Sequence, residues 1–237
     1  MPNPYFSFKH FTIRQEHAAM KVTTDACLLG AYAAAGSPDH MLDIGTGTGI
    51  LTIMLAQRYG KASIEGIEPD QAAADQARRN VDACPWKDRI RIKSIRIQDY
   101  IKNILQKFDL ILCNPPYHKS HLISSDERAN LARHSTDLTF DSLSFAVDKL
   151  ISEKGLFYVI VPPRQYIELE KELLFFGLRP VDKLLIYNLP ARPVYRVIGG
   201  FSRIVRAAGE NTLLIRNEQF EYTGEYKELL KDFYLGF

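Results

Sequence analysis

Apolar and polar positions follow two alternating periods along most of the chain. Short apolar runs with the length and residue types of strands occur in five places: 40–44, 62–67, 90–95, 108–113 and 155–161. Segments with apolar residues at helical spacing stand beside them: 23–35, 49–59, 70–83, 140–151 and 164–176. Strands and helices that alternate in this way predict right-handed βαβ crossovers, and therefore an α/β fold with a parallel sheet covered by helices on both faces.

The last part of the chain has a different pattern. Three further segments, at 184–187, 195–204 and 212–215, have strand-like composition with little helix between them. A short terminal helix is expected over 225–234. The regular crossover pattern therefore ends before these strands.

The segment DIGTGTG, from Asp43 to Gly49, joins the first predicted strand of the sheet to a helix. Its glycines, Gly45, Gly47 and Gly49, allow a tight turn and let a ligand approach the backbone closely. Ile50 stands where the dinucleotide motif GxGxxG requires a glycine. Because Asp43 would also repel a pyrophosphate, the loop favours a cationic ligand.

Two acidic residues follow the next strands of the predicted sheet. Glu68 stands 19 positions after Gly49, where a carboxylate can accept hydrogen bonds from both ribose hydroxyls of an adenosine. That arrangement suits NAD and S-adenosylmethionine alike, and a helix cap at 69–70 is the alternative. Asp99 can accept the amino group of an adenine or cap a helix over 100–105.

The strand-like run 108–113 leads directly into Asn114, Pro115, Pro116 and Tyr117. Each proline fixes its φ angle and keeps the preceding residue out of the helical region, so this corner is rigid. The side-chain oxygen of Asn114 and the carbonyl of Pro115 can then point the same way as two acceptors, beside the flat face of Tyr117. Such a corner suits a planar substrate that carries an NH2 group, because it directs the nitrogen lone pair at an electrophile.

The combination of DIGTGTG, GIEPD and NPPY resembles the class I S-adenosylmethionine-dependent methyltransferases over about residues 41–161, and NPPY is similar to the motif of their amino-methylating branch. The resemblance implies a Rossmann-like, seven-stranded, mostly parallel sheet, whose reversed last strand could come from 195–204. It implies a catalytic corner made of Asn114, Pro115, Pro116 and Tyr117. It also implies S-adenosylmethionine as the cofactor, bound by these residues: Asp43, Gly45, Thr46, Gly47, Gly49, Glu68, Pro69, Asp99 and Asn114.

Both ends of the chain carry a narrower resemblance. FKHFTI and AMKVTTDACLLGA near the start, and EYTGEY and FYL near the end, are similar to the bacterial tRNA (adenine-N6)-methyltransferases that act on adenine 37 of a valine tRNA. By this resemblance Lys21, Thr24 and Asp25 flank the cofactor pocket, whereas without it 23–35 is an ordinary capped amphipathic helix. The resemblance implies methyl transfer to the N6 amine of that adenine, with the anticodon stem-loop as the partner.

We expect a single methyltransferase domain over residues 1–237. Residues 1–39 would be an N-terminal extension that contributes to the cofactor pocket, 40–205 the catalytic core, and 206–237 a C-terminal strand and helix. The net charge is only +2, so RNA binding requires local positive charge. Two basic segments offer it, unless they are merely solvated: 183–206 with Lys183, Arg192, Arg196, Arg203 and Arg206, and 118–134 with Lys119, Arg128 and Arg133.

Other interpretations share these motifs. A ribosomal-RNA guanine-N2 or protein-glutamine N5 methyltransferase would use the same NPPY corner, and a non-catalytic RNA-binding module would hold the cofactor without turnover. Three cysteines without paired spacing and six scattered histidines predict no metal site. No apolar run approaches the roughly 18 residues of a membrane-spanning helix. We therefore expect a cytoplasmic protein without a membrane partner, with a monomer favoured.

Overall fold

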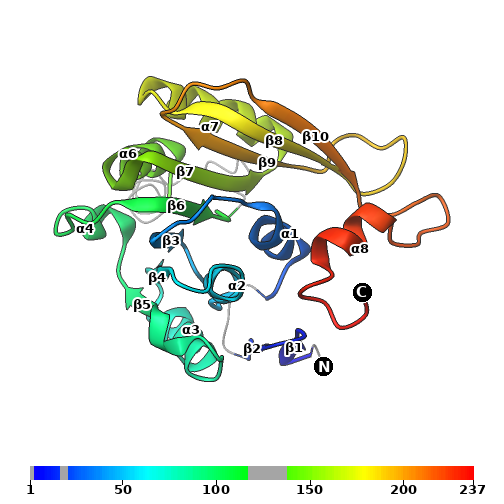
Figure 1. Ribbon diagram of the computed structural model, residues 1–237, viewed down its shortest axis with the longest axis horizontal. Coiled ribbons are helices and arrows are strands. Elements are labelled where there is room, and N and C mark those ends of the chain that lie inside the picture. Colours follow the sequence, from blue (N-terminus) through cyan, green and yellow to red (C-terminus); the bar gives the residue numbers. More distant parts are fainter. Residues whose placement is uncertain (1–2, 17–20, 117–137) are drawn as a thin grey trace, which may run out of the picture.

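A computed structural model describes residues 3–16, 21–116 and 138–237 (Figure 1). Its centre is an eight-stranded sheet in the order β10-β8-β9-β7-β6-β3-β4-β5. The strands are β3 (His40–Ile44), β4 (Ser63–Glu68), β5 (Ile90–Ser94), β6 (Phe108–Cys113), β7 (Ile151–Val161), β8 (Arg179–Tyr187), β9 (Arg196–Ser202) and β10 (Gly209–Leu214). Five consecutive strands of the sheet, β5, β4, β3, β6 and β7, run parallel to one another, which places their carboxyl ends at one edge of the sheet.

Helices cover both faces of this sheet (Figure 1). They are α1 (Thr24–Tyr32), α2 (Ile50–Arg58), α3 (Gln71–Asp82), the 3-10 helix η1 (Lys87–Arg89), α4 (Ile97–Tyr100), α6 (Phe140–Leu150), α7 (Pro163–Phe175) and α8 (Gly224–Leu230). One apolar core joins α1, α2 and α8 to one face, and a second joins α4, α6 and α7 to the other. The predicted α/β fold with helices on both faces is therefore confirmed.

The sheet has one strand more than the seven we expected. β9 runs antiparallel to β7 and β8, so the prediction that 195–204 supplies the reversed strand is confirmed. β10 then pairs in parallel with β8 and adds an eighth strand, which is the outermost strand of the sheet next to β8. Four of its six residues are exposed, because an edge strand is held mainly by backbone pairing on one side.

Two local predictions differ from the structure. The helix expected over 100–105 is instead α4, which ends at Tyr100, so Asp99 lies inside a helix and caps none. The segment 23–35 does form a helix, capped where the Thr23 hydroxyl accepts a hydrogen bond from the Ala26 amide at 3.2 Å. Residues 25–31 are all buried, however, so α1 is a core helix and not an amphipathic one.

The structure contains an N-terminal hairpin that the pattern of residues did not predict. This hairpin contacts α3. It consists of β1 (Tyr5–Ser7) and β2 (Thr12–Arg14). The buried Asn80 side chain on α3 accepts from the Arg14 amide at 2.9 Å and donates to the Arg14 carbonyl at 2.9 Å and the Thr48 carbonyl at 2.8 Å. Asn80 thereby joins the hairpin to the loop that follows β3.

Among the described residues, none of the helices combines the length and the apolar character needed to cross a membrane.

Candidate active site

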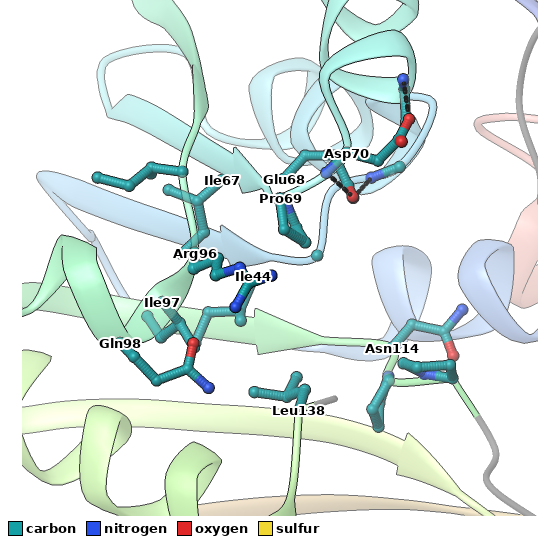
Figure 2. Close-up of a pocket in the computed structure, with 16 residues that line it drawn as sticks. Ile44, Ile67, Glu68, Pro69, Asp70, Arg96, Ile97, Gln98, Asn114 and Leu138 are labelled. Carbon is teal, nitrogen blue, oxygen red and sulfur yellow. Dashed lines mark hydrogen bonds between the residues drawn. The ribbon is translucent and has the colours of Figure 1, made fainter. Parts of the chain in front are cut away.

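A cavity of about 330 Å³ opens at the edge where β3, β4, β5 and β6 end (Figure 2). The loops after these four strands, the start of α3 and one residue ahead of α6 form its wall. Its lining residues are Ile44, Gly45, Gly47, Ile67, Glu68, Pro69, Asp70, Ala73, Ile95, Arg96, Ile97, Gln98, Asn114, Pro115, Pro116 and Leu138. The glycine loop after β3, the loop with Glu68 after β4 and the Asn114 corner after β6 therefore meet at one cavity.

The glycines of the first loop have two different roles. Gly45, Gly47 and Gly49 have φ angles of 76°, 54° and 84°, a region that disfavours side chains. Nothing lies within 4 Å of a Cβ built at Gly45 or Gly47, and both line the cavity. A Cβ at Gly49 would lie 3.4 Å from Ala77 on α3, and Gly49 is the N-cap of α2. Gly45 and Gly47 thus leave room for a ligand, whereas Gly49 lets two helices pack closely.

Glu68 connects the first loop to the second. Its Oε2 accepts a hydrogen bond from the Gly47 amide at 3.0 Å, and its Oε1 accepts one from the Asp70 amide at 3.1 Å. Burial raises the pKa of Glu68, while these two backbone bonds oppose the rise. Asp70 is the cap of α3, through a 2.7 Å bond from the Ala73 amide to its Oδ1. Glu68 is therefore free of the capping role and presents a carboxylate to the cavity (Figure 2).

Asp43 lies beneath the glycine loop and is fully buried. Its Oδ2 accepts from the Thr52 hydroxyl at 2.9 Å, and the Thr52 and Thr46 hydroxyl oxygens are 2.6 Å apart. None of the described residues hydrogen-bonds to its Oδ1. Burial raises the pKa of Asp43 to about 6, with a smaller contribution from Glu68 and opposing ones from the two threonines. Asp43 and Thr46 therefore support the loop from below and are absent from the cavity wall.

The small residue that makes this buried cluster possible is Gly66 on β4. A Cβ at Gly66 would lie 3.0 Å from each of the Thr46 and Thr52 hydroxyl oxygens and 2.8 Å from Ile92. Contacts this close would force the threonines apart. The glycine in GIEPD is thus required by the packing under the loop.

The strand β6 ends at Cys113, and the next three residues turn into the cavity wall. Asn114 is half-buried, Pro115 is buried and Pro116 is exposed. In Figure 2, Asn114 lies at one end of the cavity, and Gln98 and Ile97 lie toward the other. Tyr117 lies outside the described residues.

The segment after β5 contributes residues to the cavity, but the expected residue Asp99 is not one of them. The exposed Asp99 forms an ion pair with Lys102, at 2.7 Å between Nζ and Oδ1, and this bond lowers the pKa of Asp99. Its neighbours Arg96, Ile97 and Gln98 line the cavity instead. Their position after a strand on the same edge was the only sequence signal for them. Among these side chains, the amide of Gln98 can both donate and accept hydrogen bonds.

The residues expected to flank the pocket at the start of α1 do not line this cavity. Lys21 and Thr24 are exposed. Asp25 is buried and accepts a 2.7 Å bond from the Nε of Arg196, with which it forms an ion pair. This pair joins the N-terminal turn of α1 to the start of β9.

The five cations of the basic segment 183–206 have different surroundings in the structure. Three of its cations pair with acids: Lys183 with Glu210, Arg196 with Asp25, and Arg203 with Asp148. These ion pairs reduce the positive charge that the three residues can offer to a phosphate. Arg192 is exposed in the loop between β8 and β9, at the edge that holds the cavity, whereas Arg206 is exposed beyond the far end of β9. The other basic segment, 118–134, lies outside the described residues.

No group of three or more histidine, cysteine, aspartate or glutamate side chains suited to a metal ion occurs within 3–16, 21–116 and 138–237.

Known proteins are similar to this chain in sequence and in fold. The Methyltransferase small domain model matches residues 24–138. A protein of Trichodesmium erythraeum named tRNA1(Val) (adenine(37)-N6)-methyltransferase is 38% identical over 98% of this chain and 98% of its own length. A protein of Phocaeicola vulgatus with the same name is 39% identical over 100% of both chains.

Solved structures with lower identity show the same fold. A predicted O-methyltransferase of Agrobacterium tumefaciens is 20% identical, with a TM-score of 0.65 over 88% of this chain and 96% of that one. TYW2 of M. jannaschii, solved in complex with AdoMet, is 14% identical, with a TM-score of 0.58 over 84% of this chain and 86% of that one. With full-length relatives at this level of identity, the chain belongs to the family of tRNA1(Val) (adenine(37)-N6)-methyltransferases.

Proposed function

We propose that the protein transfers a methyl group from S-adenosylmethionine to the N6 amine of adenine 37 in tRNA1(Val). The observation that carries this proposal is the meeting of two features at one cavity. The Asn114–Pro115–Pro116 corner, suited to an NH2 group, lines the same cavity as the open glycines Gly45 and Gly47 and the carboxylate of Glu68. The names of full-length relatives supply the nucleotide and the tRNA.

The cavity offers groups that fit S-adenosylmethionine. The Glu68 carboxylate retains acceptor capacity beyond its two backbone bonds, so it can receive the ribose hydroxyls. Ile67, Ile97 and Leu138 supply apolar surface for an adenine, and Gln98 supplies a polar edge. The buried negative charge of Asp43 below the loop favours a cationic ligand above it. When bound, S-adenosylmethionine supplies a sulfonium methyl group that is already activated for transfer.

The protein's task is then to orient the amine. The Asn114 side-chain oxygen and the Pro115 carbonyl would accept the two N–H bonds of the adenine N6 group, which directs the nitrogen lone pair toward the cofactor side of the cavity. Tyr117 would stack on the ring. Since the nitrogen becomes cationic as its new bond forms, it loses a proton readily and needs no dedicated base.

The tRNA would present this adenine from the anticodon stem-loop. A base in a loop is cheaper to extrude than one in a duplex, and single-stranded loops are where RNA bases are recognised. Arg192, exposed at the cavity edge, is the best placed of the described cations in 183–206 to meet a phosphate. We further propose that the enzyme acts in the cytoplasm as a single-domain monomer.

The test is to supply labelled S-adenosylmethionine with bulk tRNA, ribosomal RNA or release-factor protein in separate reactions. We expect label in tRNA1(Val), recovered as N6-methyladenosine at position 37 after nuclease digestion and mass spectrometry. Label that enters only ribosomal RNA or protein would reject the tRNA assignment in favour of the alternative NPPY enzymes.

A substitution tests the corner itself. Asn114→Ala should lower kcat by at least about 100-fold, because one of two positioned acceptors is lost. Asn103→Ala, in an exposed turn after α4, is the matched control and should leave kcat unchanged. An Asn114→Ala enzyme with normal turnover would remove the proposed role of the corner.

A further inference from the structure

The start of β9 carries an arginine–tyrosine pair that the proposed methyl transfer does not use. The guanidinium carbon of Arg196 lies 4.0 Å from the centre of the Tyr195 ring, within the range of cation–π stacking. The same guanidinium donates from Nη1 to the Tyr195 carbonyl at 2.9 Å. The Tyr195 amide donates to the Ile186 carbonyl at 2.7 Å. Both the backbone and the ring of Tyr195 are thus held in place.

Asp25 holds the arginine from the other side. The Arg196 side chain is only 16% exposed and the Asp25 side chain 7%, with 2.7 Å between Nε and Oδ2. A guanidinium bound this way to a buried carboxylate is fixed in orientation. Because the carboxylate offsets its positive charge, it attracts distant phosphates only weakly. The guanidinium also presents the flat surface on which Tyr195 lies.

Tyr195 as a whole residue nevertheless remains 39% exposed. It belongs to neither apolar core and is not among the residues that line the cavity. A rigid, half-open aromatic ring backed by a guanidinium is the arrangement that RNA-binding proteins use to stack unpaired bases.

The register of the sheet places this ring beside the Asn114 corner. Cys113 pairs with Val159 on β7, and Val161 pairs with Val197 on β9. Continued by one residue, the second register places Arg196 opposite Pro162, directly after β7, while β6 lies on the other side of β7 with the Asn114 corner at its end. Two strand spacings, about 10 Å, separate β9 from β6. Tyr195 therefore stands at the same edge as the cavity but outside it.

We propose that Tyr195 is a stacking platform for the base of a nucleotide next to the target adenine, and that Arg196 and Asp25 are the residues that position it. This inference rests on the proposed function. Extruding one base from the anticodon loop removes a stacking partner from each neighbour. An aromatic ring two strands away from the corner, at the same edge of the sheet, replaces that partner for one neighbour, while the extruded adenine occupies the cavity.

The experiment uses a synthetic anticodon stem-loop of tRNA1(Val) in which 2-aminopurine, whose fluorescence is quenched by stacking, replaces either nucleotide beside adenine 37. For one of the two positions, we expect quenching when the RNA binds the full-length protein. Tyr195→Ala should abolish that quenching and raise the Kd about tenfold, whereas Tyr195→Phe should keep both near the wild-type values. Arg196→Lys keeps a positive charge opposite Asp25 but loses the planar surface, so it should reduce quenching without weakening S-adenosylmethionine binding.

Phe175 provides the matched control. It is an 83% exposed aromatic residue at the last turn of α7, at the edge of the sheet opposite the cavity. Phe175→Ala should leave quenching and Kd unchanged. Unchanged quenching and Kd in Tyr195→Ala would overturn the inference while wild-type methylation of adenine 37 stood. Absence of methylation by the wild-type protein would instead refute the proposed function.

Discussion

At the residue scale, the carboxyl group of Asp43 makes the folded protein sensitive to pH. Burial raises its pKa to about 6, from 3.8. Between these values the folded protein holds a proton that the unfolded chain has already released. The contribution of this group to stability is therefore complete below pH 3.8 and is lost as the pH rises through about 6. The total change is about 3 kcal/mol.

Replacing this carboxyl by an amide should remove that dependence. We expect Asp43→Asn to gain stability relative to the wild type by about 2 kcal/mol, most of the total change, as the pH is raised from 4 to 7, because the amide has no proton to release. Urea unfolding at several pH values measures the difference. Asp141→Asn, an exposed position on α6, should show no such trend. A constant difference between Asp43→Asn and the wild type would contradict the prediction.

Gln98 and Asp99 are adjacent residues with different surroundings. Gln98 lines the cavity, whereas Asp99 pairs with Lys102 at the surface. We expect Gln98→Ala to weaken S-adenosylmethionine binding about fivefold, since one polar contact is lost, and Asp99→Asn to leave it unchanged. Isothermal titration calorimetry compares the two. If Asp99→Asn proves the weaker binder, the adenine contact belongs to Asp99, as the sequence suggested.

At the scale of elements, the sequence pattern located the strands that are buried on both faces. It missed the structural features that depend on pairing with distant parts of the chain. β3 and β6 are short, mainly apolar and buried segments that match their predicted bounds. β8 begins at Arg179 rather than 184, because its first half is held by pairing with β9 rather than by its own composition.

In the site, Gly45, Gly47, Glu68, Pro69 and Asn114 lie on the cavity as expected. Gln98 was missed because its position depends on how the chain turns from β5 into α4.

The side chain of Asn80 on α3 joins the hairpin of β1 and β2 to the loop after β3. Asn80 is 1% exposed and makes three hydrogen bonds to Arg14 and Thr48. Asn80→Ala would leave buried backbone groups unpaired, so we expect a loss of about 2–3 kcal/mol in the free energy of unfolding. Gln71→Ala, at an exposed position on the same helix, should change it by less than about 0.5 kcal/mol. Urea unfolding decides, and a loss no greater than that of Gln71→Ala would show that the hairpin is anchored elsewhere.

At the scale of the whole molecule, cations of the basic segment 183–206 lie at both edges of the sheet where its strands end. The net charge of +2 provides no general attraction for RNA, and three cations of 183–206 are neutralised by acids. The remaining two lie at opposite edges: Arg192 precedes β9 at the cavity edge, and Arg206 follows it at the other. If tRNA approaches the cavity edge, Arg192→Ala should reduce the slope of log K against log salt concentration by about 1, while Arg206→Ala leaves the slope unchanged. Filter binding of tRNA1(Val) over a range of salt concentrations measures both slopes. An equal reduction in the two variants would mean that the tRNA reaches both edges, and the surface proposed for its anticodon loop would then have to extend across the whole sheet.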